Sequence, residues 1–105
     1  MLRGRKVKIR LKRAVSEQRV RVFVGTVLDM ENAWLKVEGK FYTLAKGETK
    51  PRVDAKLKIL CIPRESINII RILPDDLDLN NIKYEIKDTR MMINVGGHEP
   101  VSISE

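Results

Sequence analysis

Residues 19–28 read Arg-Val-Arg-Val-Phe-Val-Gly-Thr-Val-Leu, and this stretch decides the fold. In its first half, charged and apolar side chains alternate with the period of two that is typical of a half-buried β-strand. Gly25 then interrupts the pattern, and a glycine inside a strand usually marks a bulge or a sharp bend. We therefore expect a long, bent strand here.

The neighbouring segments show the same period. Residues 6–12 place Val7, Ile9 and Leu11 on one face and should form a hairpin with the bent strand. Beyond a turn at Asp29–Asn32, residues 34–44 place Leu35, Val37 and Phe41 on one face, with Tyr42 on the other and open to solvent. Two further strands are expected at 56–62 and 67–72, joined by a tight turn at 63–66. This order predicts an all-β fold, a small five-stranded, strongly bent barrel of the Sm-like or SH3-like kind.

Length and composition fit one domain. The chain has 105 residues and a single cysteine, so an internal disulfide is impossible and stability must come from packing. The barrel should occupy residues 1–73, because Leu73-Pro74 ends the strand pattern. Residues 74–105 are expected to hold an acidic linker, an extra β-hairpin formed by alternating residues after Ile82, and a frayed tail.

Charge is unevenly distributed along the chain. Residues 1–74 carry 18 Lys or Arg against 7 Asp or Glu, whereas residues 75–105 carry 3 against 7. A cationic body attracts polyanions and releases their counterions, so nucleic acid is the first partner to consider. In the first strand the alternation directs four basic side chains, Lys6, Lys8, Arg10 and Lys12, to a common face that would contact phosphates. The alternative is a solvated face that the acidic tail neutralises, and a tail competing with nucleic acid would make binding autoinhibited.

Residues 7–73 resemble the Sm-like family, which includes the LSm and Hfq-type proteins. The resemblance rests on Val24-Gly25-Thr26-Val27, on Asp29 and Asn32 ahead of Trp34-Leu35-Lys36-Val37, and on the final strand pair around Cys61 and Asn68. Both RNA-binding motifs diverge from the family pattern. Asp29 follows Gly25 by four positions instead of six, and Pro63-Arg64 stands where the family has Arg-Gly.

The resemblance implies RNA binding and assembly into rings of six or seven, with the fourth strand of one subunit paired to the fifth strand of the next. It points to Asn32 and Arg64 as RNA-binding residues, with Arg64 supplying the guanidinium from the position next to the usual one. Trp34 is a candidate for stacking on a base, although a partly buried tryptophan at a strand start is the simpler interpretation. The loop at 45–55 would add phosphate contacts from Lys46, Lys50 and Arg52.

Catalytic and metal chemistry have little support in the sequence. No nucleophile, base and orienting acid can be assembled, and neither His98 nor Cys61 has partners for a metal site, so we expect no enzyme activity, no cofactor and no metal. Cys61 lies between apolar neighbours and should be a buried thiol. The chain shows no apolar segment long enough to span a membrane and no secretory signal, which makes a cytoplasmic location the expectation.

Two functions remain in view. The first is a non-catalytic, Sm-like protein that binds single-stranded RNA as a homo-oligomer. The second is a protein-interaction or structural SH3-like barrel module without nucleic-acid binding.

Overall fold

The computed structural model describes residues 2–12, 19–45, 52–79, 82, 84–87, 90–93 and 101–102. Among these residues there is no α-helix, and nearly all regular structure is antiparallel β-sheet. The main sheet contains six strands: β1 (Lys6–Leu11), β2 (Arg19–Met30), β3 (Trp34–Ala45), β4 (Arg52–Val53), β5 (Lys58–Pro63) and β6 (Ile67–Ile72). A 3-10 turn, η1 (Arg64–Ser66), joins β5 to β6.

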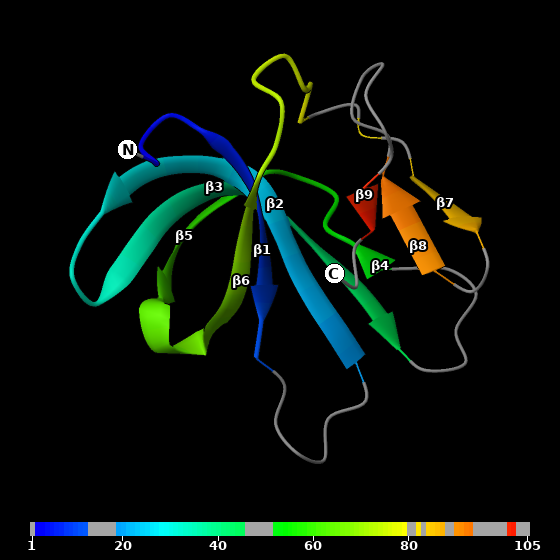
Figure 1. The fold of residues 1–105 in the computed structure, drawn as a ribbon, viewed down its shortest axis with the longest axis horizontal. Helices are drawn as coiled ribbons and strands as arrows, with labels where there is room; N and C mark the ends of the chain where they lie inside the picture. The colour runs from blue at the N-terminus through cyan, green and yellow to red at the C-terminus, as the bar shows by residue number, and fades with distance from the viewer. Residues whose placement is uncertain are drawn as a thin grey trace.

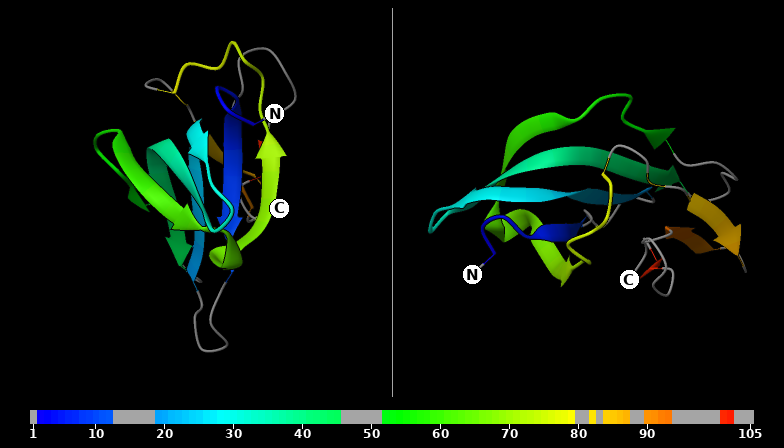
Figure 2. Two further views of the ribbon diagram at one scale, coloured as in Figure 1. Left: turned by 90° about the vertical axis from the view of Figure 1, so that its left-hand side faces the viewer. Right: turned by 90° about the horizontal axis from the view of Figure 1, so that it is seen from above.

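The strand order of the main sheet is β4-β3-β2-β1-β6, with β5 also pairing with β3. The first part of β3 pairs with β5 and its last part pairs with β4. The two long strands bend, and β5 and β6 lie on opposite sides of the curl they enclose (Figures 1 and 2). The expected all-β fold is confirmed, and the five expected strands are present. Within the described residues no ladder joins β5 to β6, so the sheet is curled but not closed.

Two glycines allow the tight approach of β2 and β3. Gly25 and Gly39 face each other in the ladder between these strands. A Cβ atom added to Gly39 would overlap the carbonyl oxygen of Val24 and lie 2.6 Å from Cα of Gly25, and one added to Gly25 would overlap the carbonyl oxygen of Glu38. Only glycine fits such a contact between backbones. Beyond it, β2 carries a bulge between Val27 and Asp29.

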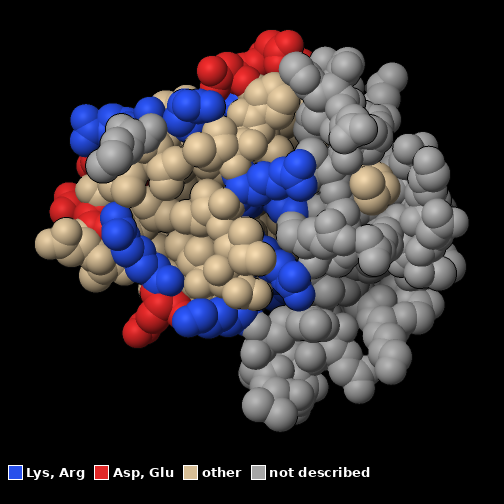
Figure 3. All heavy atoms as spheres, in the orientation of Figure 1, with Lys and Arg blue, Asp and Glu red and all other residues tan. Residues whose placement is uncertain are grey.

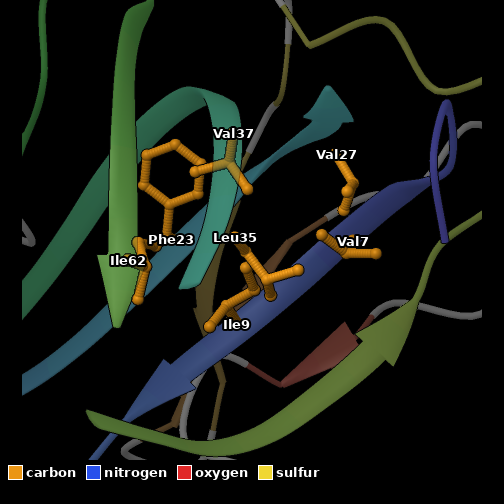
Figure 4. Packing of buried hydrophobic residues seen from close by; sticks show 7 residues of the cluster. All are labelled: Val7, Ile9, Phe23, Val27, Leu35, Val37 and Ile62. Carbon is orange, nitrogen blue, oxygen red and sulfur yellow. The ribbon is translucent and has the colours of Figure 1, made fainter. Parts of the chain in front are cut away.

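The concave side of the curl holds the inner cluster, made of seven buried side chains from four strands (Figure 4). Its members are Val7, Ile9, Phe23, Val27, Leu35, Val37 and Ile62. Phe41 is partly buried against this cluster, with its ring edge-on to Phe23 at a centroid distance of 5.1 Å. On β1 and β3 the inner cluster therefore joins side chains that alternation assigned to one face, whereas on β2 it takes Phe23 and Val27 and leaves Val22 and Val24 on the opposite face.

A second cluster covers the convex side of the sheet. This outer cluster consists of Val22, Val24, Tyr42, Leu73 and Leu77. Tyr42 is only 2% exposed, which corrects the expectation of a solvent-facing ring. The reason is that residues 74–79, expected to be a linker, turn at Pro74 and fold back over the sheet, so that Leu77 is 3% exposed. Consequently β1 and β2 are covered on both faces.

The expected C-terminal hairpin is present. Strands β7 (Tyr84–Lys87) and β8 (Arg90–Ile93) are antiparallel, with Lys87 opposite Arg90. The tail was expected to fray beyond residue 96, but its residues Val101–Ser102 form β9, which pairs with β8. These three strands make a separate small sheet.

Candidate nucleic-acid interface

The turn η1 brings together four of the residues that the sequence nominated for RNA binding. The amide of Arg64 donates a hydrogen bond to the carbonyl of Ala33 at 2.9 Å, and Trp34 lies opposite Pro63 in the β3–β5 ladder. On the other side, the amide of Lys12 donates to the carbonyl of Ser66 at 2.8 Å. We call this region the η1 end, defined by Lys12, Asn32, Trp34 and Arg64. Lys12, Asn32 and Arg64 are exposed and Trp34 is half-buried.

Local sequence explains why the chain turns here. Pro63 has φ −60° and ψ 134°, close to the only φ that its ring allows, and it ends β5 in an extended conformation. The hydroxyl of Ser66 donates a hydrogen bond to the carbonyl of Pro63 at 2.8 Å, which closes the turn. The adjacent β2–β3 turn is closed by a bond from the amide of Glu31 to the carbonyl of Trp34 at 2.9 Å. Both turns are therefore held by short-range bonds, and they present their side chains outward.

Asp29, which the resemblance groups with Asn32, is engaged within the fold. Its Oδ1 accepts a hydrogen bond from the amide of Met30 and forms an ion pair with Arg3, each at 2.8 Å. The bond from the Met30 amide and the nearby Arg3 guanidinium both lower the pKa of Asp29 below its ordinary value. Asp29 thus links the N-terminal segment to the bulged part of β2. Because its carboxylate is already bound, it would support a ligand site by holding the backbone and not by contacting the ligand.

The expected basic face of β1 differs in the structure. Lys8 is completely buried, and Arg10 is half-buried. The ammonium of Lys6 donates to the carbonyl of Asp75 at 2.7 Å and also to the carbonyl of Leu77. The four side chains do follow the alternation, but residues 73–79 fold over the face they occupy. Only Lys12, beyond the end of β1, remains exposed and able to meet a phosphate.

The expected phosphate-binding loop is described only in its second half. Lys46 and Lys50 lie outside the described residues, and Arg52 is exposed on β4. Sequence reasoning missed Asp54, which fastens this end of the loop. Its Oδ2 accepts from the amide of Phe41 at 2.9 Å, and its Oδ1 pairs with Lys58 at 3.3 Å. The only signal in the sequence was an aspartate four residues before a lysine.

The strands β5 and β6 each have one edge that no other described strand covers, since β5 pairs with β3 and β6 pairs with β1. Large apolar side chains are exposed on both: Ile59 at 60%, Ile69 at 46% and Ile72 at 48%. Cys61 is also exposed, which corrects the expected buried thiol, because Leu60 and Ile62 point inward and the residue between them points outward. In Figure 3, apolar and neutral atoms occupy the middle of the described surface, and Lys and Arg groups lie around them.

Among the described residues, no group of three or more His, Cys, Asp or Glu side chains is placed to hold a metal ion. That same part of the chain has no helix with the length and apolar character needed to cross a membrane. Comparison with protein-family models, with curated proteins and with solved structures finds no match.

Proposed function

We propose that this protein binds single-stranded RNA without catalysis, through the η1 end, and acts as a homo-oligomer of Sm-like type. The observation that carries the proposal is the pair of backbone bonds from Arg64 to Ala33 and from Lys12 to Ser66. They bring a lysine, an arginine, an asparagine and a tryptophan from three separate parts of the chain to one exposed end of the sheet. No single segment of the sequence contains this set.

Each of the four side chains has a chemistry that suits single-stranded RNA. Lys12 offers an ammonium to a phosphate, and Arg64 offers a planar guanidinium that binds phosphate or stacks on a base. Asn32 can donate to and accept from a base edge. Trp34 offers an aromatic face, and stacking of a base on such a ring contributes about 1–3 kcal/mol in known cases. The bases of single-stranded RNA are unpaired, so their faces can stack on an exposed ring and their edges can form hydrogen bonds with exposed side chains. No groove or deep pocket is required.

The order of elements supports the Sm-like part of the proposal. The elements on which the resemblance rests occur in the expected order, since β2 contains Gly25, β3 begins at Trp34, and β5 and β6 form the final pair of strands. The two backbone bonds from Arg64 to Ala33 and from Lys12 to Ser66 link the ends of β1 and β3, which would favour closure of the curled sheet into a small barrel. Family membership itself remains part of the proposal.

Assembly follows from the two uncovered edges. Exposed strand edges with apolar side chains are an aggregation hazard unless another strand covers them. Pairing β5 of one subunit with β6 of the next would cover both edges in every copy and would shield Ile59 and Ile69. Each subunit would then contribute one η1 end to the assembly, so weak phosphate contacts would add through avidity.

The test is a titration of fluorescently labelled single-stranded RNA, using uridine and adenosine 12-mers, over a series of salt concentrations. Binding through phosphates predicts that log K falls linearly with log salt. Arg64→Gln should weaken binding, whereas Lys56→Gln removes one exposed positive charge outside the η1 end and serves as the matched control. Equal behaviour of both variants would refute the assignment of the site.

The burial of Lys8 and the internal bonds of Lys6 favour a second candidate, a protein-interaction or structural module that does not bind nucleic acid. In that case the apolar residues on β5 and β6 would contact a protein partner, and the positive charge would serve solubility. Absence of RNA binding at low salt would support this candidate over the first.

A further inference from the structure

The segment Leu73–Leu79, which we call the acidic strap, is fixed to the sheet by apolar burial. Leu73 and Leu77 are 2% and 3% exposed and pack against Val22, Val24 and Tyr42. The amide of Leu73 also donates to the carbonyl of Lys6 at 2.8 Å. Because both leucines are almost fully buried, the strap is held by apolar packing as well as by charge.

The strap engages the cations at the beginning of β1. Nε of Arg5 lies 3.2 Å from Oδ1 of Asp75, and the ammonium of Lys6 donates to backbone carbonyls of Asp75 and Leu77. Asp76 and Asp78 add two exposed carboxylates to the same short segment. A polyanion approaching this end of β1 therefore meets three carboxylates, the half-exposed Arg5 guanidinium that is paired with Asp75, and a Lys6 ammonium already bound to two carbonyl groups.

The η1 end lies too far from the carboxylates of the strap to be affected by their negative charge. Lys12 follows Lys6 by six residues along an extended strand, which corresponds to roughly 20 Å. The Debye length at physiological ionic strength is about 8 Å, so the carboxylates of the strap are largely screened at Lys12. The two ends of β1 thus differ in charge environment although the sequence of β1 is basic throughout.

We propose that the acidic strap is a fixed electrostatic shield, which closes the Arg5–Lys6 end of β1 to polyanions and confines them to the η1 end. The identity of the polyanion as RNA rests on the proposed function; the shield itself concerns any polyanion. Because Leu73 and Leu77 anchor the strap by burial, a polyanion does not displace it from the Arg5–Lys6 end. Binding is therefore restricted to the η1 end at every ligand concentration. The shield acts most directly on Arg5, because Asp75 forms an ion pair with it and neutralises its charge.

The test is a double-mutant cycle of Arg5→Gln and Asp75→Asn in the full chain, read on heparin and on a single-stranded RNA 12-mer. Arg5→Gln alone should change affinity less than twofold, like the charge control Lys56→Gln. Asp75→Asn should raise affinity about threefold to tenfold at low salt and steepen the salt dependence by roughly 0.7, because one more phosphate is neutralised. Adding Arg5→Gln to Asp75→Asn should remove that gain.

Glu38→Gln is the control for loss of one negative charge, since Glu38 lies on β3, two strands away from β1. Circular dichroism of each variant checks that the sheet is intact. The shield is overturned if Asp75→Asn matches Glu38→Gln on heparin, or if Arg5→Gln alone weakens heparin binding as much as Lys12→Gln. If RNA binds neither the wild type nor any variant, but Asp75→Asn still raises the affinity for heparin, the proposed function is refuted and the shield is supported.

Discussion

Gly25 and Gly39 lie opposite each other in the ladder between β2 and β3, and neither position has room for a Cβ atom. Gly25 also pairs with Val7, so this point lies in the middle of three adjacent strands. The contact between the two backbones sets the bend that wraps the sheet around the inner cluster. A side chain at either position must move a strand, not merely another side chain.

Gly39→Ala is expected to destabilise the fold by about 3 kcal/mol, the upper end of the range for overpacking, because the new methyl group would overlap the backbone of β2. Urea unfolding followed by circular dichroism measures the change. Gly4→Ala is the contrast, since Gly4 has φ +80° with open space around it, and its cost of about 1 kcal/mol would come from the backbone conformation alone. A smaller loss for Gly39→Ala than for Gly4→Ala would contradict the close approach.

Leu77→Ala should cost about 2–4 kcal/mol, because Leu77 is nearly fully buried in the outer cluster and its removal leaves a cavity beneath the strap. Thermal or urea unfolding gives the value. Leu79→Ala is the matched control, as Leu79 is only partly buried against the same cluster, and a smaller loss is expected. Similar losses for both variants would mean that Leu77 is not the principal anchor.

Asp29 predicts a pH dependence of stability. Its pKa in the folded state is lowered by the Met30 amide and by Arg3. The carboxylate therefore stabilises the fold above the unfolded-state pKa of about 3.9, and this contribution is lost as the pH falls through that value toward the folded pKa. Urea unfolding of the wild type from pH 6 to pH 2.5 should show a steeper acid loss than Asp29→Asn. Identical profiles would place the stabilising charge elsewhere.

Assembly through strand edges predicts that charge on an edge keeps subunits apart. Ile59→Lys or Ile69→Lys should shift the protein toward the monomer, because a desolvated lysine opposes strand pairing between subunits. Light scattering coupled to gel filtration measures the mass. Leu28→Lys is the control, since Leu28 is 36% exposed on β2, a strand paired on both sides. Dissociation by Leu28→Lys alone would point to a different interface.

Stacking and charge at the η1 end can be separated. Trp34→Ala should weaken binding of an RNA 12-mer by about 1–3 kcal/mol with no change in the salt dependence, because a ring contributes no counterion release. Trp34→Phe should retain part of the affinity, as it keeps an aromatic face. A change in salt dependence on Trp34→Ala would instead indicate that the loss of the ring has disturbed the phosphate-binding residues.

Alternation in the sequence was sufficient to predict the strands around the inner cluster. Val7, Ile9, Leu35 and Val37 lie at the positions that a period of two assigns to one face, and the turn at Pro63 is where the chain reverses. Local patterns carry this information because each strand must bury its own apolar face. Gly25 indicated the bend, whereas its partner Gly39 emerged only from the register.

The convex side could not be predicted from local patterns. Tyr42 and Lys8 were expected to be exposed because Leu73 was assigned to the end of the last strand and Leu77 lies in a segment that looked like an acidic linker. Two leucines among aspartates carry no strand or helix period. The gathering of Lys12, Asn32, Trp34 and Arg64 was also hidden, since it depends on backbone bonds between distant turns. Each of the four was nominated separately.

The position of β1 between β2 and β6 has a consequence for how the chain folds. Ile9 pairs with Phe23 on one side and with Ile70 on the other, so the first strand is complete only when a late part of the chain has arrived. Sheets built from such distant pairings fold on the scale of milliseconds to seconds, because the connecting chain must be ordered before the contacts stabilise it. During synthesis, the outer edge of β1 in the β1–β2 hairpin would therefore have unpaired backbone groups until Ile67–Ile72 leaves the ribosome.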